Sequence, residues 1–203
     1  MCPRLLAAAL LIVLSSCGAA PSVSPASPPR LSRVPRDSSL IVEETESRDG
    51  RRYIGGTAFS ILSASPDTVA LLLEDPKALW QVLPRLVSME VRERDAAERS
   101  IALEHGFGLF RGGYTVRMVQ RRVPWAGGWV LRFALDKRFE HDVVDAFGRF
   151  ELHPYGEGAT LVIYQVRIAL DAGVLRLFFE ERLRRAALSV ADRLRRYVAR
   201  QKH

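Results

Sequence analysis

Residues 71–91 read LLLEDPKALWQVLPRLVSMEV, and this stretch decides the fold because it joins two short helices to a strand. Upstream, Ser65 is typical of a helix N-cap and Pro66 of a first helical position, so SPDTVALLLED predicts a short apolar helix. The second helix, PKALWQVLP, ends at Pro84 because proline lacks a backbone donor and restricts the residue before it. The residues that follow alternate between apolar and polar, which predicts a strand.

Further alternating runs surround this helix pair. Glycines or charged turns bound each run at hairpin-like spacing, which favours an antiparallel meander. The runs are RRYIGGTAFSIL (51–62), LVSMEVRERD (86–95), RSIALEHGF (99–107), GGYTVRMVQRRV (112–123), GGWVLRFALDK (127–137), VVDAFGRFELHP (143–154) and ATLVIYQVRIAL (159–170). The sequence therefore predicts one strand, two short helices and six more strands.

The chain closes with a long amphipathic helix over residues 173–202. At 3.6 residues per turn, its apolar stripe comprises Leu175, Phe179, Leu183, Ala186, Ala187, Val190, Ala191, Leu194 and Tyr197. The opposite face is mainly arginine, and the net charge of +7 suits nucleic acid or an anionic membrane. Because Glu180, Glu181 and Asp192 interrupt the arginines, we interpret this face as solvent-exposed and expect no nucleic-acid partner.

The N-terminal segment predicts export. Arg4 precedes an apolar run from Leu5 to Leu14 that is too short to span a bilayer but suits a signal peptide. The run ends in LSSC, which resembles the bacterial lipobox, where the cysteine thiol receives a diacylglycerol. We therefore predict a lipoprotein signal peptide over residues 1–17, with Cys17 as the lipid attachment site and the membrane as a partner. An ordinary secretory signal or a buried helix remains the alternative.

Residues 18–50 are rich in Pro, Ser and Ala, and we predict a disordered tether because such a segment buries little apolar surface. Gly18 follows the lipobox cysteine. In lipoproteins of two-membrane bacteria an Asp there favours retention at the inner membrane, so the resemblance implies an outer-membrane anchor facing the periplasm. Residues 51–203 are predicted to fold as one monomeric domain. One cysteine stays in the mature chain, which excludes a disulfide framework.

The order of strand, helix pair, six-stranded meander and closing helix resembles the START-like or SRPBCC superfamily. The local matches are the spacing of Asp75 to Leu83-Pro84 and the hairpin GRFELHPYGEGATLVIYQVRI, which is similar to the polyketide cyclase and coenzyme Q-binding subgroup. The resemblance implies an α+β helix-grip fold: a curved seven-stranded antiparallel sheet around the closing helix, with two lid helices. Gly148 departs from the subgroup, which often has Trp there.

Strand alternation separates inward from outward side chains, and the implied fold places the inward ones around an apolar cavity. Small residues such as Ala146 and Gly148 leave volume in the middle of the sheet, although a tightly packed aromatic core is the alternative. In this fold Trp80 and Leu83 would lie at the cavity mouth. The predicted ligand-binding residues are Trp80, Leu83, His105, Tyr114, Met118, Trp129, Phe133, Gly148, Phe150, Tyr164 and Phe179.

Motifs of catalysis are missing from the sequence: it has no nucleophile elbow, phosphate loop, HExxH helix or paired-cysteine motif. His105 is a candidate general base, but a hydrogen-bonded core histidine is the simpler interpretation, and no metal or cofactor is predicted. We therefore predict a membrane-tethered carrier of an apolar molecule such as a lipid, a quinone or a polyketide-like compound. A cyclase- or hydrolase-like enzyme and an interaction module with a filled core are the alternatives.

Overall fold

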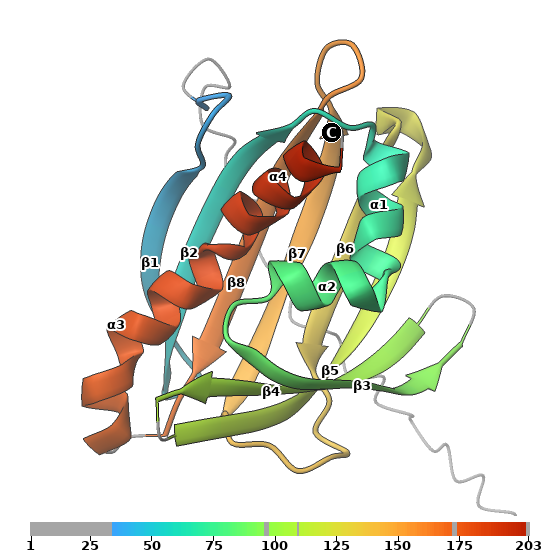
Figure 1. The fold of residues 1–203 in the computed structure, drawn as a ribbon. Helices are drawn as coiled ribbons and strands as arrows, with labels where there is room; N and C mark the ends of the chain where they lie inside the picture. Colours follow the sequence, from blue (N-terminus) through green and yellow to red (C-terminus); the bar gives the residue numbers. More distant parts are fainter. Residues whose placement is uncertain (1–33, 96–97, 109, 172–173, 202–203) are drawn as a thin grey trace, which may run out of the picture. The chain divides into compact units, whose positions relative to one another are not determined.

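The computed structural model describes residues 34–201, except 96–97, 109 and 172–173. The elements in chain order are β1 (Leu40–Arg48), β2 (Arg51–Leu62), α1 (Pro66–Glu74), α2 (Pro76–Val82), β3 (Leu86–Arg94), β4 (Glu98–Phe107), β5 (Phe110–Val123), the 3₁₀ turn Pro124–Ala126, β6 (Gly128–Leu135), β7 (Asp145–Pro154), β8 (Thr160–Ala169), α3 (Val174–Leu188) and α4 (Val190–Arg200). The strands form one eight-stranded antiparallel sheet in the order β1-β2-β8-β7-β6-β5-β4-β3. All four α-helices lie on one face of this sheet (Figure 1).

The architecture confirms the predicted α+β helix-grip fold, with one strand more than expected. The additional strand, β1, lies in the segment assigned to the tether, so the boundary predicted at residue 51 was wrong. Asp49 and Gly50, both with positive φ, form the turn to β2, and an Asp-Gly turn is a strong hairpin signal. The acid-rich composition of β1 concealed it, because an edge strand is largely exposed and shows little apolar alternation.

Another residue of the predicted tether, before β1, also contributes to packing. Val34 is buried and forms a small apolar cluster with Phe59, Ile61 and Leu161. Residues 32–203 form one compact unit with its own core, which is the requirement for independent folding. The predicted signal peptide, Cys17 and the tether before residue 34 lie outside the described residues.

The lid helices are fixed at their ends by side-chain caps. Ser65 Oγ accepts a hydrogen bond from the backbone N–H of Thr68 at 3.2 Å, and Asp75 Oδ1 accepts one from the N–H of Lys77 at 3.0 Å. Asp75 is therefore both the C-cap of α1 and the N-cap of α2. Each helix buries a short apolar face, formed by Val69, Ala70 and Leu73 in α1 and by Ala78, Leu79 and Val82 in α2.

The closing helix is divided at Ser189 into α3 and α4, although the sequence predicted one continuous helix. The Ser189 hydroxyl donates to the carbonyl of Ala186 at 2.7 Å, and such back-bonding by serine is known to bend helices. The predicted apolar stripe faces the sheet where it is described, since Ala187, Val190, Ala191 and Leu194 are buried. Within the described part of the chain, the helices are too short or too polar to cross a bilayer.

Candidate functional site

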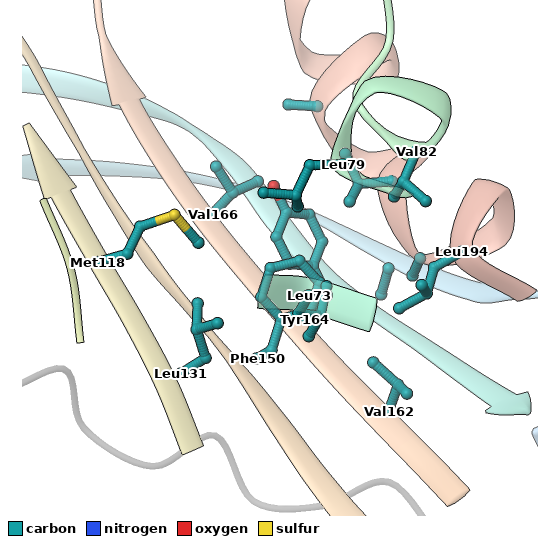
Figure 2. Close-up of a cluster of buried hydrophobic side chains, with 14 of the residues drawn as sticks. Leu73, Leu79, Val82, Met118, Leu131, Phe150, Val162, Tyr164, Val166 and Leu194 are labelled. Carbon is teal, nitrogen blue, oxygen red and sulfur yellow. The ribbon is translucent and has the colours of Figure 1, made fainter. Parts of the chain in front are cut away.

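A cavity of about 340 Å³ lies between the concave face of the sheet, the lid and the closing helices. Figure 2 shows buried apolar side chains of the core; some of them also line the cavity, among them Leu79 of α2 and Tyr164 of β8. Most side chains on its wall are apolar. Besides the polar residues described below, the wall includes Leu73, Leu79, Val82, Leu83 and Pro84 of the lid; Ile101, Leu103, Val116, Met118, Phe133, Ala146, Phe150, Tyr164, Val166 and Ile168 of the sheet; and Phe179, Leu183, Ala186, Ala187 and Val190 of the closing helices.

Aromatic rings form the floor of the cavity on the sheet. Phe150 and Tyr164 are cross-strand partners, with ring centroids 4.5 Å apart, and Phe133 lies 6.2 Å from each. Such offset and tilted pairs hold the rings in place beyond simple area burial. The closing helices contribute two small side chains to the wall, Ala186 and Ala187, which leave more room above the aromatic floor than large side chains would. The volume between them is the physical origin of the cavity.

A histidine–tyrosine pair is the main polar group on the wall. His105 Nδ1 lies 2.8 Å from the carbonyl oxygen of Pro84, which can only accept, so Nδ1 carries the proton. His105 Nε2 therefore accepts from the Tyr114 hydroxyl at 3.1 Å. Burial lowers the pKa of His105 below its ordinary value, and burial raises the pKa of Tyr114 to about 12. Both groups are thus neutral at physiological pH, and both ring nitrogens of His105 are occupied.

Tyr164 differs from Tyr114 because its hydroxyl has no hydrogen-bond partner among the described residues, although the side chain lies on the cavity wall. Burial raises the pKa of Tyr164, with a smaller contribution from nearby Tyr114, so this hydroxyl remains a donor. The Tyr164 hydroxyl is not among the described polar atoms that are buried without a partner, so it is open to the cavity space, where solvent or a ligand can reach it. Tyr164 therefore presents a free donor inside an otherwise apolar space.

The mouth of the cavity lies where the β4–β5 hairpin approaches the start of the closing helix. Phe107 and Phe179 meet there edge to face, with ring centroids 6.4 Å apart. The exposed side chains of Arg111, Asp142 and Asp171 complete the rim. Asp142 is fixed by the backbone of β5, since its carboxylate accepts from Gly113 N–H at 2.8 Å. The mouth is thus polar and charged, whereas the interior is apolar.

A second, more polar hollow of about 260 Å³ lies at the opposite end of the concave face, beneath the end of α1. Arg99 lines it and donates to the carbonyls of Leu73 and Glu74, the latter at 2.7 Å, so its guanidinium caps α1. Met118 lines both hollows and separates them. The described residues contain no cluster of three or more His, Cys, Asp or Glu side chains arranged for a metal ion.

No protein-family model matches the sequence, and no curated protein matches it either. Solved structures are similar to it in fold. A STAR-related lipid transfer protein from Xanthomonas axonopodis has a TM-score of 0.65 at 14% identity, over 80% of this chain and 99% of that one. The Zhui aromatase/cyclase from a Streptomyces species gives 0.58 at 14% identity, over 81% and 96%. The protein TTHA0849 from Thermus thermophilus gives 0.59 at 18% identity, over 72% and 98%.

This chain has the START-like helix-grip fold. Within the grip, the structure places on the cavity wall most of the residues that the sequence predicted to face it: Leu83, His105, Tyr114, Met118, Phe133, Phe150, Tyr164 and Phe179. Whether these residues bind a ligand remains a prediction. Strand alternation was sufficient to find those on the sheet, because the concave face holds every second residue.

Contrary to the prediction, Trp80, Trp129 and Gly148 do not lie on the cavity wall. Trp80 is 42% exposed on the outer side of the lid, because Leu79 and Val82 occupy the inner side of the short helix. Trp129 faces inward but lies under α1, where its Nε1 donates to Asp67 at 2.7 Å. At Gly148 the space is already filled by the ring of Phe133, its cross-strand partner, since an added Cβ would lie 2.4 Å from the ring.

The sequence also failed to identify several wall residues from the lid and the hairpin, including Leu79, Pro84 and Phe107. For Leu79 the available signal was its helical spacing to Val82, which places both on one face of α2. Phe107 offered no such signal, because it ends a strand beside a glycine and its direction depends on the course of the hairpin.

Proposed function

We propose that the helix grip binds an apolar small molecule that presents an oxygen acceptor to the Tyr164 hydroxyl. The free hydroxyl inside the apolar cavity is the observation that carries this proposal. A ligand carbonyl or hydroxyl oxygen would accept from Tyr164 in place of solvent, which gives the apolar ligand one directed polar contact. The Tyr114 hydroxyl donates its hydrogen bond to His105, and its oxygen lone pairs could accept one from a ligand hydroxyl nearby.

The size and lining of the cavity support a ligand of this kind. Its volume of about 340 Å³ falls at the lower end of the range of about 300–1,000 Å³ for small-molecule sites, which are mostly apolar with a few polar groups. Similar solved structures include a STAR-related lipid transfer protein and an aromatase/cyclase, by name. An interaction module with a filled core was the alternative, and the cavity argues against it.

The proposal includes the anchor that the sequence predicts. Lipidation of Cys17 would hold the carrier on the cell envelope, in the outer membrane facing the periplasm, with the tether before residue 34 as a spacer. The test is metabolic labelling with a palmitate analogue in the host organism. The wild-type chain should be labelled and Cys17→Ser should not, and label on the mutant would refute the anchor.

The enzyme alternative receives less support from the geometry. A general base needs a free lone pair within reach of the substrate, yet His105 Nδ1 donates to Pro84 and His105 Nε2 accepts from Tyr114. Asp142 is at the rim, where it is exposed and bonded to Gly113. The described wall therefore binds and orients a ligand better than it exchanges protons with one.

The decisive experiment compares two fluorescent naphthalene probes of similar size, one with a ketone and one without. We expect both to bind the wild type, and Tyr164→Phe to weaken the ketone probe by roughly 2- to 12-fold, the equivalent of one hydrogen bond of about 0.5–1.5 kcal/mol. Binding of the hydrocarbon probe should not change. Equal losses for both probes would refute the hydrogen bond, and a wild type that binds neither would refute the carrier.

A further inference from the structure

The outer side of the lid exposes large apolar side chains. Trp80 of α2 is 42% exposed and Leu71 of α1 is 67% exposed, whereas most large apolar side chains of the domain are buried or partly buried. Neither residue reaches the cavity wall. The two belong to consecutive helices whose outer sides face away from the sheet (Figure 1). Large apolar side chains that are exposed together on one surface are typical of interaction sites.

Arginines follow the outer side of the closing helices next to the lid. Arg182, Arg185, Arg193, Arg196 and Arg200 are spaced by three, four or eight residues, which places them on one stripe of the α3–α4 axis. All are exposed or partly exposed. Arg193 Nη1 donates to the carbonyl of Gln81 at 3.4 Å, so this stripe directly adjoins α2.

Carboxylates neutralise the stripe only in part. Arg185 pairs with Glu181 at 3.0 Å, and Arg196 pairs with Asp192 at 3.1 Å. Asp192 also bonds Arg195 at 2.8 Å. Lys77, one turn before Trp80 on α2, adds a further exposed cation. The face is therefore cationic around an exposed tryptophan.

We propose that this lid face, defined by Leu71, Lys77, Trp80, Arg193, Arg196 and Arg200, docks on an anionic lipid surface. Tryptophan prefers the headgroup region of a bilayer, where its ring is apolar and its N–H is solvated. Lys and Arg beside it are attracted to anionic headgroups, and each contributes roughly a fivefold gain in affinity near the surface. Apolar insertion combined with basic contacts is the pattern of proteins that lie on a membrane.

A lipid surface explains this combination better than nucleic acid does. Nucleic-acid binding relies on phosphate contacts and on stacked aromatic rings along a groove, and here one tryptophan stands beside a leucine on a convex helix pair. Leu71 has no role in such a complex, whereas it adds buried apolar area in a bilayer. The proposal does not depend on the identity of the cavity ligand.

The test uses residues 32–203, the compact unit, after a cooperative melting transition has been verified. Flotation is measured with vesicles of phosphatidylcholine alone and with about 30% phosphatidylglycerol. We expect at least tenfold tighter binding to the anionic vesicles, which salt weakens. Trp80→Ala should reduce this binding at least fivefold, and the combined change Lys77→Gln, Arg196→Gln and Arg200→Gln should reduce it at least tenfold.

Matched controls separate the lid face from the general positive charge. Val91→Ala removes an equally exposed apolar side chain from the edge strand β3, and the pair Arg121→Gln and Arg132→Gln removes exposed cations from the opposite face of the sheet. Both controls should bind within twofold of the wild type. Control variants that lose as much as the lid variants would overturn the proposal, as would equal binding to neutral vesicles or displacement from anionic vesicles by an equimolar oligonucleotide.

Discussion

Replacing Gly148 by alanine should destabilise the domain strongly, because the glycine is enclosed on two sides. A Cβ at this position would lie 2.2 Å from the carbonyl oxygen of Gln165 on β8 and 2.4 Å from Phe133 Cζ on β6. Ordinary van der Waals contacts with a Cβ begin at about 3.4 Å, so each neighbour would have to move by roughly 1 Å. Phe133 could rotate, but the carbonyl belongs to the backbone of a central strand.

Overpacking of this kind costs about 1–3 kcal/mol, and the backbone clash puts Gly148→Ala toward the upper end of that range. For a domain of this size we expect the melting temperature to fall by roughly 4–12 °C. Gly148→Trp should be worse and should not fold stably, since the cavity does not extend to this position. Thermal melting followed by circular dichroism measures both effects.

Gly112→Ala is the matched control, because an added Cβ at Gly112 meets no atom within 4 Å and φ there is not positive. This variant should melt within about 1 °C of the wild type. If Gly148→Ala melts as the control does, the packing of Phe133 over the glycine is wrong. The position would then be open, and the ring of Phe133 would have to lie elsewhere in the aromatic floor of the cavity.

Two further predictions concern pH and chain length. Because burial lowers the pKa of His105, the stability that neutral His105 contributes is complete above the unfolded pKa of about 6.5 and is lost as pH falls toward the folded pKa. The melting temperature of the wild type should therefore fall between pH 7.5 and 5, and that of His105→Gln should fall less. Equal falls in the two proteins would contradict the assignment. A chain starting at residue 32 should melt within about 2 °C of one starting at residue 18. A chain starting at residue 49 should melt at least about 5 °C lower, because it lacks Val34 and β1 and exposes Phe59 and Ile61. Equal melting temperatures of all three chains would show that β1 and Val34 contribute no stability.

Periodicity was sufficient to predict the strands and helices whose faces differ in polarity. The strand from Gly128 to Leu135 shows this, since Leu131 and Leu135 are buried and Arg132 is exposed. It failed for β1, where an edge strand needs no apolar face and acidic residues are tolerated. It also failed at Ser189, because the bend depends on a hydroxyl contact that helical spacing does not encode.

The sequence predicted which side chains face the concave side of the sheet, but not which of them border the cavity. Alternation identifies which side chains face inward, yet it does not say whether a side chain such as Trp129 meets the cavity or the underside of α1. That depends on where each helix crosses the sheet. The error at Gly148 has a similar cause. The volume that a glycine leaves is free only if no side chain of the neighbouring strand occupies it, and the ring of Phe133 occupies it here.

The lid helix α2 has one side on the cavity and the other side exposed. Its neighbour α1 is fastened to the sheet through Arg99 and through Trp129, whereas the hydrogen bond from Arg193 to the backbone of α2 is long, at 3.4 Å. A helix of seven residues has little stability of its own, so its position depends on the contacts of its two sides. Leu79 on the inner side meets the cavity, and Trp80 on the outer side meets the surroundings. If a membrane binds the outer side as proposed above, it acts on the same short helix that closes the cavity, so we expect anionic vesicles to change the rate of ligand exchange in the wild type and not in Trp80→Ala.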